Sequence, residues 1–277
     1  MSFAMSAAHS TIAATMQDLA FVFAGFFVGF VVALTGVGGG SLMTPLLIFG
    51  FGIAPNLAVG TDLLFAAGTK LGGTLQLARR RLVPWRVVGQ LSLGSIPAAL
   101  ATLYVLHRVG PAEPAVQRAI TLTLGAALLL TAAATFYKAN LGHAPQRQPA
   151  ATGIDPTRAR HWALPIALGA VIGSLVTLTS VGAGAIGVAV LLLLYPALPL
   201  ARIVAADIAY AVPLTLVAGL GHAAIGSVDW TLLALLLCGS LPGIWVGTRL
   251  AQHAPQRWVR TLLSLLLAYA GSKLVLA

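Results

Sequence analysis

The chain has 277 residues, of which 58% are hydrophobic and 8% are charged, and its formal net charge is +10. Soluble domains carry about 25% charged residues, so this composition excludes a soluble globular domain and predicts a polytopic protein of the lipid bilayer. The basic residues lie in short links between apolar segments, which excludes nucleic-acid binding because no basic face of a soluble fold is available.

Ten apolar segments follow one another along the chain. They run over residues 18–34, 41–52, 56–78, 87–106, 115–137, 162–178, 185–195, 199–224, 230–251 and 258–276. A spanning helix needs about 20 apolar residues, so the sequence predicts an all-α integral membrane protein with roughly 8–10 membrane segments. The second segment of each half is short for a full span.

The segments form two groups of five. We expect an N-terminal tail over residues 1–17, a first transmembrane repeat over 18–137, a polar linker over 138–161 and a second repeat over 162–277. The N-terminus lacks a basic region and a clear cleavage site, so we expect the first apolar segment to be a retained span.

The two groups of segments are similar in sequence. The stretch Leu34 to Gly40 (LTGVGGG) matches Leu178 to Gly184 (LTSVGAG) at a spacing of 144 residues. At a spacing of 145 residues, Asp62 matches Asp207, Trp85 matches Trp230, and the Gly-Ser-x-Pro element at 94–97 matches 239–242. The same features in the same order indicate an internal repeat.

The basic residues predict that the two repeats are inverted in the membrane. Arg79, Arg80, Arg81 and Arg86 lie between the third and fourth segments of the first half, where the second half has no basic residue. Between the fourth and fifth segments the bias is reversed. The positive-inside rule then favours inverted repeats with both termini outside.

Each half is interrupted by a glycine-rich break. A helix does not continue stably through such a run, since each glycine costs about 1 kcal/mol relative to alanine. Irregular backbone is tolerated in a membrane only where protein or a cavity satisfies it, so paired breaks point to a transporter's binding site. The helix that follows each break would present free N–H groups to a small anion. The predicted substrate-binding residues are Thr35, Gly36, Gly38, Gly39, Gly40, Ser41, Thr179, Ser180, Gly182 and Gly184.

Close packing of small residues is the alternative interpretation of these breaks. A dinucleotide-binding turn is excluded, because no third glycine follows at the required spacing and no soluble βαβ unit surrounds the motif.

These motifs resemble the sulfite exporter (TauE/SafE) family of bacterial membrane proteins. The resemblance rests on the break at 35–41 followed by Pro45, on Gly60-Thr61-Asp62, on the basic link before Trp85 and on the weaker second copy. It implies a multi-pass protein of the bacterial cell (inner) membrane that exports sulfite, sulfoacetate or another sulfur-containing organic anion. The second copy departs from the pattern, with Ser180 for Gly36 and Ala183 for Gly39.

Asp62, Lys70 and Asp207 are the charged residues inside or just within long apolar segments. The two aspartates lie near the starts of equivalent helices, where a carboxylate can cap the helix or carry a coupling proton. Both alternatives stay open from the sequence. Lys70 is a candidate for extension to the lipid headgroups, for an ion pair with a carboxylate or for substrate contact, and His222 is expected at the membrane interface.

The sequence predicts a secondary transporter of a small anion, and the resemblance implies that it exports sulfite or an organosulfonate. The alternatives are a non-transporting membrane scaffold and an anion channel. No catalytic set, metal-ligand cluster or cofactor motif is visible, and Cys238 is the only cysteine. The predicted partners are the small anionic substrate, the lipid bilayer and a coupling proton or other ion, and a homodimer stays open.

Overall fold

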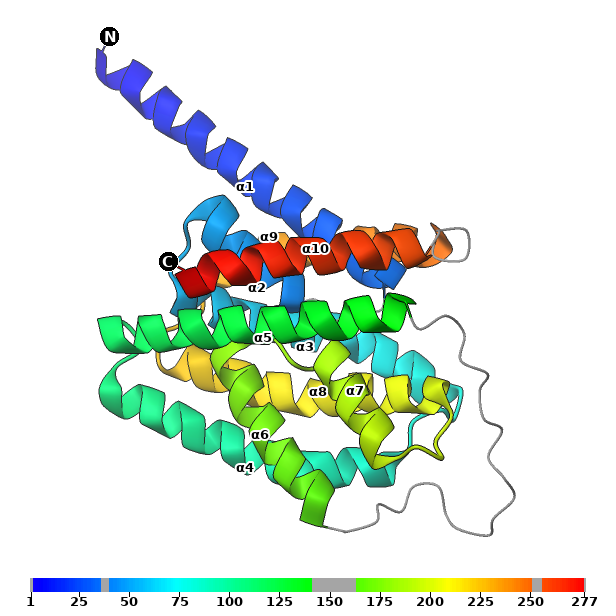
Figure 1. The fold of residues 1–277 in the computed structure, drawn as a ribbon. Helices are drawn as coiled ribbons and strands as arrows, with labels where there is room; N and C mark the ends of the chain where they lie inside the picture. The colour runs from blue at the N-terminus through cyan, green and yellow to red at the C-terminus, as the bar shows by residue number, and fades with distance from the viewer. Residues whose placement is uncertain (1, 36–39, 141–162, 251–255, 277) are drawn as a thin grey trace.

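Ten helices form the regular structure of residues 2–35, 40–140, 163–250 and 256–276, which the computed structural model describes (Figure 1). They are α1 (Ser2–Thr35), α2 (Gly40–Phe51), α3 (Pro55–Arg79), α4 (Trp85–Val109), α5 (Pro114–Asn140), α6 (Ala163–Thr179), α7 (Ala185–Leu194), α8 (Leu200–Ala224), α9 (Trp230–Leu250) and α10 (Gln256–Leu276). These residues contain no strand, so the predicted all-α class is confirmed. Six helices in the described ranges, α1, α4, α5, α8, α9 and α10, are long and apolar enough to cross a membrane.

The helix boundaries follow the predicted segments except at the N-terminus. Helix α1 begins at Ser2, so residues 2–17, predicted as a tail, extend the first apolar segment as a helix. This stretch contains several alanines and neither glycine nor proline, which favours helix. Figure 1 shows that the N-terminal part of α1 projects beyond the other helices. Most of the predicted linker, residues 141–161, lies outside the described residues.

The helices of the two halves are interleaved. Helix α1 packs along α9, α4 packs along α6, α3 packs on α8, and α5 lies beside α10 (Figure 1). Replacing every helix by its counterpart in the other half leaves these four pairs unchanged. The packing therefore supports the internal repeat inferred from the sequence.

The equivalent helices α3 and α8 run antiparallel. The start of α3 approaches the end of α8, where the Gly60 backbone lies against the side chain of His222. Towards the end of α3, the Thr74 hydroxyl donates to the carbonyl of Ile208, near the start of α8, over 3.5 Å. Inversion of the two repeats requires this antiparallel pairing. The side of the membrane on which each end lies stays a prediction.

Glycines allow the interleaved helices to approach closely. Four of them lie against the backbone of the partner helix at equivalent places, so that a Cβ atom on any of them would overlap a carbonyl group: Gly94 against Ile166, Gly239 against Val22, Gly169 against Leu91, and Gly25 against Leu236. In a membrane, van der Waals packing at small residues supplies much of the association between helices. The glycines of α1, α4, α6 and α9 thus join one half to the other.

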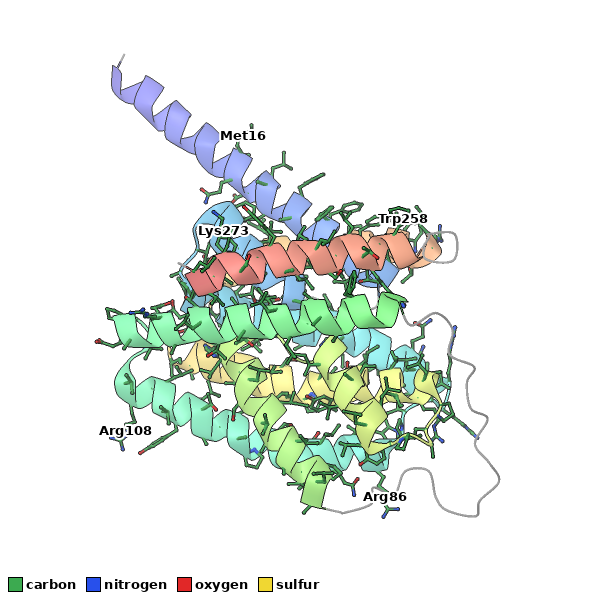
Figure 2. The ribbon with its side chains drawn as sticks, viewed as in Figure 1. Met16, Arg86, Arg108, Trp258 and Lys273 are labelled. Carbon is green, nitrogen blue, oxygen red and sulfur yellow. The ribbon has the colours of Figure 1, made fainter. Side chains whose placement is uncertain are left out.

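The outer surface is apolar, as a lipid-facing surface must be. Large hydrophobic side chains such as Leu193, Trp258 and Leu276 are exposed. Figure 2 shows Met16 and Trp258 at the periphery of the bundle, with Arg86 and Arg108 along its lower edge. An apolar outer face over a packed apolar interior is typical of helices that have lipid as their solvent.

Candidate functional site

The start of α2 meets the second break inside the bundle. Gly40 is the first residue of α2, and a Cβ atom on it would overlap the carbonyl group of Ser180 in the second break. Both residues are buried. The predicted site residues Gly36, Gly38 and Gly39 lie outside the described residues, so the contact joins the start of α2 to the second break.

The second break contains backbone conformations that favour glycine. Gly182 and Gly184 have φ angles of +131° and +144°, in a region that side-chain-bearing residues rarely adopt. Ser180 has φ +57°, an uncommon left-handed conformation for a residue with a Cβ atom. Strained residues of this kind cluster at functional sites. Helix α7 restarts when the N–H of Gly187 donates to the carbonyl of Gly182 over 2.9 Å.

The hydroxyls of Thr35 and Thr179 shape the ends of their own helices. Thr35 donates to the Val31 carbonyl over 2.8 Å, and Thr179 donates to the Leu175 carbonyl over 2.7 Å. The Thr179 oxygen also accepts from the N–H of Val181 over 3.1 Å. These two hydroxyl groups therefore donate to backbone carbonyls. Of the predicted hydroxyls, the buried Ser41 and Ser180 are then the better candidates for binding a ligand.

Asp62 does not cap its own helix. It is the eighth residue of α3, which begins at Pro55 and has no side-chain cap. Its buried carboxyl instead faces α2, where the Thr44 hydroxyl donates to Oδ2 over 2.5 Å. The second oxygen, Oδ1, has no hydrogen-bond partner in the described residues, although the Ser180 hydroxyl lies close enough to interact electrostatically. The capping interpretation is therefore wrong for Asp62, and its carboxyl faces the junction of the two breaks.

Asp207 occupies the equivalent place in the second half. It is the eighth residue of α8, which begins at Leu200, so it does not cap its own helix either. Its carboxyl lies against the backbone of Gly187 in the first turn of α7, where a Cβ atom would overlap Oδ1. Each aspartate is thus presented to the short helix that follows its own half's break. A helix start carries the positive end of the helix dipole, which stabilises a nearby carboxylate.

Lys70 connects the two halves of the site. It extends from α3 to the second break, where Nζ donates to the Ala183 carbonyl over 3.1 Å. It also interacts electrostatically with Asp207 and Asp62. Its counterpart in the second repeat is Thr215, so the ammonium group has no equivalent there. The side chain therefore points into the bundle and not towards the lipid headgroups.

Asp62, Asp207 and Lys70 together carry one negative charge when all three are ionised. A buried charge without a counter-ion is costly, so such a group of three favours uptake of one monovalent cation or proton. An additional anion binds with less repulsion when one carboxyl is neutral, because the ammonium group then balances the remaining carboxylate and the helix starts attract the anion.

Several polar residues of the interior escaped the sequence analysis. Thr44 contacts Asp62, and Tyr210 is fully buried one turn after Asp207. His222, expected at the membrane interface, is fully buried, with Nε2 at 3.0 Å from the Thr177 carbonyl. Helical spacing from the aspartates is the sequence signal that would have found Tyr210. The contact between Thr44 and Asp62 depends on tertiary packing and leaves no such signal.

A cavity of about 400 Å³ lies elsewhere, along α4 beside Pro97. Its lining residues, Gly89, Ser92, Leu93, Ile96 and Pro97, all belong to this one helix, and the lining is apolar. It is therefore a groove on an outer helix face and is separate from the junction of the breaks. Among the residues that the structure describes, no cluster of His, Cys, Asp and Glu side chains is suited to hold a metal ion.

Interleaved halves, interrupted helices and charged residues between them are typical of multi-pass membrane transporters. The sequence matches the family "Sulfite exporter TauE/SafE" over residues 21–274, and the chain belongs to this family.

Two relatives from Bacillus subtilis (strain 168) are named as transporters. "Probable membrane transporter protein YjnA" is 35% identical over 259 residues, which cover 94% of this chain and 100% of the relative. "Probable membrane transporter protein YunE" is 29% identical over 245 residues, which cover 85% of this chain and 87% of the relative. No solved structure matches the chain. The predicted family and the predicted membrane transporter class are thus confirmed.

Proposed function

We propose that this chain is a secondary transporter that exports a small anion, such as sulfite or an organosulfonate, across the bacterial inner membrane. The observation that carries the proposal is the convergence of Lys70, Asp62 and Asp207 where Gly40 meets Ser180. One half-buried cation beside two helix starts suits a compact anion, and two carboxyls suit a coupling proton or cation.

The anion is proposed to bind between the two repeats. Of the predicted residues, the described Gly40, Ser41, Ser180, Gly182 and Gly184 would surround it with backbone N–H groups and hydroxyls. Thr35 and Thr179 would hold the ends of the preceding helices in place. The charge balance indicates that the anion is accompanied by neutralisation of at least one carboxyl, which would couple transport to a proton or cation gradient.

Flux measurements in proteoliposomes test the proposal. Sulfite, sulfate, organosulfonates and carboxylates are supplied one at a time, with and without an imposed proton gradient. We expect saturable flux of a sulfur oxyanion that responds to the gradient. Flux that rises linearly with concentration and never exceeds equilibrium would identify a channel. A purified, folded protein that moves none of these anions would favour a non-transporting scaffold.

A further inference from the structure

Tyr210 is a buried phenol whose hydroxyl has no hydrogen-bond partner in the described part of the chain. A phenol hydroxyl in the interior normally finds a partner, because leaving it unpaired forfeits the hydrogen bonds that it makes in water. The other fully buried tyrosine follows this rule, since the Tyr195 hydroxyl donates to Oε1 of Gln90 over 2.8 Å. The unpaired hydroxyl of Tyr210 therefore needs an explanation.

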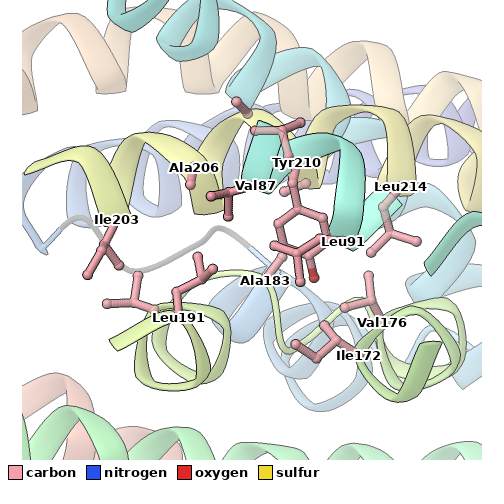
Figure 3. Close-up of a cluster of buried hydrophobic side chains, with 14 of the residues drawn as sticks. Val87, Leu91, Ile172, Val176, Ala183, Leu191, Ile203, Ala206, Tyr210 and Leu214 are labelled. Carbon is pink, nitrogen blue, oxygen red and sulfur yellow. The ribbon is translucent and has the colours of Figure 1, made fainter. Parts of the chain in front are cut away.

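The side chain of Tyr210 lies in the same buried cluster as Ala183 of the second break. Tyr210 follows Asp207 by one helical turn on α8, so both side chains leave the same face of that helix. Figure 3 shows the ring extending from α8 into the buried cluster that also contains Ala183 and Leu91. Ala183 is the residue of the break whose carbonyl accepts from Lys70. The phenol and the ammonium group thus approach the same segment of irregular backbone.

The repeat shows that this hydroxyl is an addition to the common fold. The residue equivalent to Tyr210 in the first half is Phe65, which is equally buried. Both halves therefore bury an aromatic ring at this place. The first half does so without a hydroxyl group. Ser180 is a similar addition, since its equivalent is Gly36, and its hydroxyl also has no hydrogen-bond partner among the described residues.

We infer that Tyr210 is a substrate-binding residue that donates a hydrogen bond to an anionic oxygen of the transported oxyanion. This inference rests on the proposed function. The hydroxyls of Tyr210 and Ser180 both belong to the second repeat, whereas Lys70 comes from the first. The bound anion is thus oriented, with its oxygens towards the second break and the ammonium group of the first repeat beside it.

The test compares Tyr210→Phe with Tyr195→Phe, which removes a hydroxyl of the same kind that has a protein partner. The half-saturating sulfite concentration is measured in proteoliposomes, with ethanesulfonate and sulfate as alternative probes, and the Tm of each ligand-free protein is measured in detergent. We expect Tyr210→Phe to raise the half-saturating concentration about 10- to 100-fold, because a hydrogen bond to a charged group is lost. Its ligand-free Tm should stay equal or rise, since an unpaired buried hydroxyl is removed. Tyr195→Phe should lower the Tm and leave the half-saturating concentration unchanged.

Two results would overturn the inference. If the wild type transports an anion and Tyr210→Phe shows the same half-saturating concentration, Tyr210 does not contact substrate. If Tyr210→Phe lowers the ligand-free Tm as Tyr195→Phe does, its hydroxyl has a structural partner. A wild type that transports none of the probes contradicts the proposed function itself, and the role of Tyr210 fails with it.

Discussion

At the scale of single residues, the site is a small set of buried charges held by polar contacts from both halves. Asp62 accepts from Thr44 on α2, and Lys70 donates to Ala183 in the second break. Each of these groups is away from bulk water, so its interactions are stronger than they would be at a surface. Changes that alter charge without altering shape therefore separate the roles of the three residues.

Asp62→Asn and Asp207→Asn test the coupling role of the carboxyls. Asparagine retains the shape and the hydrogen-bonding oxygen of aspartate but does not exchange a proton near neutral pH. We expect each variant to exchange anion across equal gradients and to lose accumulation driven by a proton gradient. The measurement is counterflow compared with gradient-driven uptake of labelled anion. Asp229→Asn is the control, because Asp229 is exposed and accepts from the N–H of Leu232 over 3.0 Å at the start of α9. Full gradient-driven transport by both variants would exclude a proton at these sites.

Lys70→Gln tests the contribution of the half-buried cation. The glutamine side chain can still donate to the Ala183 carbonyl, but it does not attract an anion. We expect the half-saturating anion concentration to rise about 10- to 100-fold, which corresponds to the loss of one charge-assisted interaction. Flux against concentration gives this value. Lys273→Gln, at an exposed position of α10, should leave it unchanged. An unaltered half-saturating concentration in Lys70→Gln would assign the lysine to a structural ion pair.

At the scale of elements, the molecule depends on helices from one half that pack closely on helices from the other. Gly239 of α9 lies against the Val22 carbonyl and the Phe26 N–H group of α1. Its equivalent, Gly94 of α4, lies against the Ile166 carbonyl and the Ala170 N–H group of α6. An added side chain at these contacts cannot be accommodated by a rotamer change, because the atoms on both sides belong to helix backbone.

Gly239→Ala should therefore destabilise the protein by about 1–3 kcal/mol, the usual cost of overpacking. Gly72→Ala is the matched control, since a Cβ atom at Gly72, also within a helix, meets nothing within 4 Å. The control should be neutral or stabilising by up to about 1 kcal/mol, because alanine favours helix over glycine. Thermal unfolding in detergent measures both. Equal Tm values for the two variants would show that α1 and α9 can separate at no cost.

At the scale of the whole molecule, the antiparallel pairing of α3 and α8 predicts that equivalent ends lie on opposite sides of the membrane. The end of α3 and the end of α8 are equivalent, and the two helices run in opposite directions. By the positive-inside rule we expect the arginines that follow α3 to lie inside and the end of α8 to lie outside.

Single cysteines at Arg80 and Ala224 test this orientation. Both positions are exposed, and the only native cysteine, Cys238, is replaced by alanine in the background. In intact cells a membrane-impermeant maleimide should label Ala224→Cys, whereas Arg80→Cys should react only after permeabilisation. Labelling of both positions from the same side would contradict the inverted topology.

The sequence by itself determined the solvent of this protein and its helical class, and it indicated an internal repeat. Few charges and long apolar segments leave lipid as the surrounding medium, and lipid requires every backbone group to be satisfied within helices. The breaks were also visible, because a glycine run such as that before Gly40 does not continue a helix. Asp62, Lys70 and Asp207 were recognisable as unusual because charges inside apolar segments are rare.

Only the tertiary structure decided what those residues contact. Local pattern places Asp62 and Asp207 near the starts of their helices, which made capping a reasonable interpretation, yet each carboxyl faces a different helix. Lys70 meets Ala183 across 113 residues of chain, and no local signal encodes so distant a contact. The unpaired hydroxyl of Tyr210 is likewise defined by its surroundings, because burial and partners depend on how the two halves interleave. Periodicity reports the face of one helix, whereas a binding site is made where several helices meet.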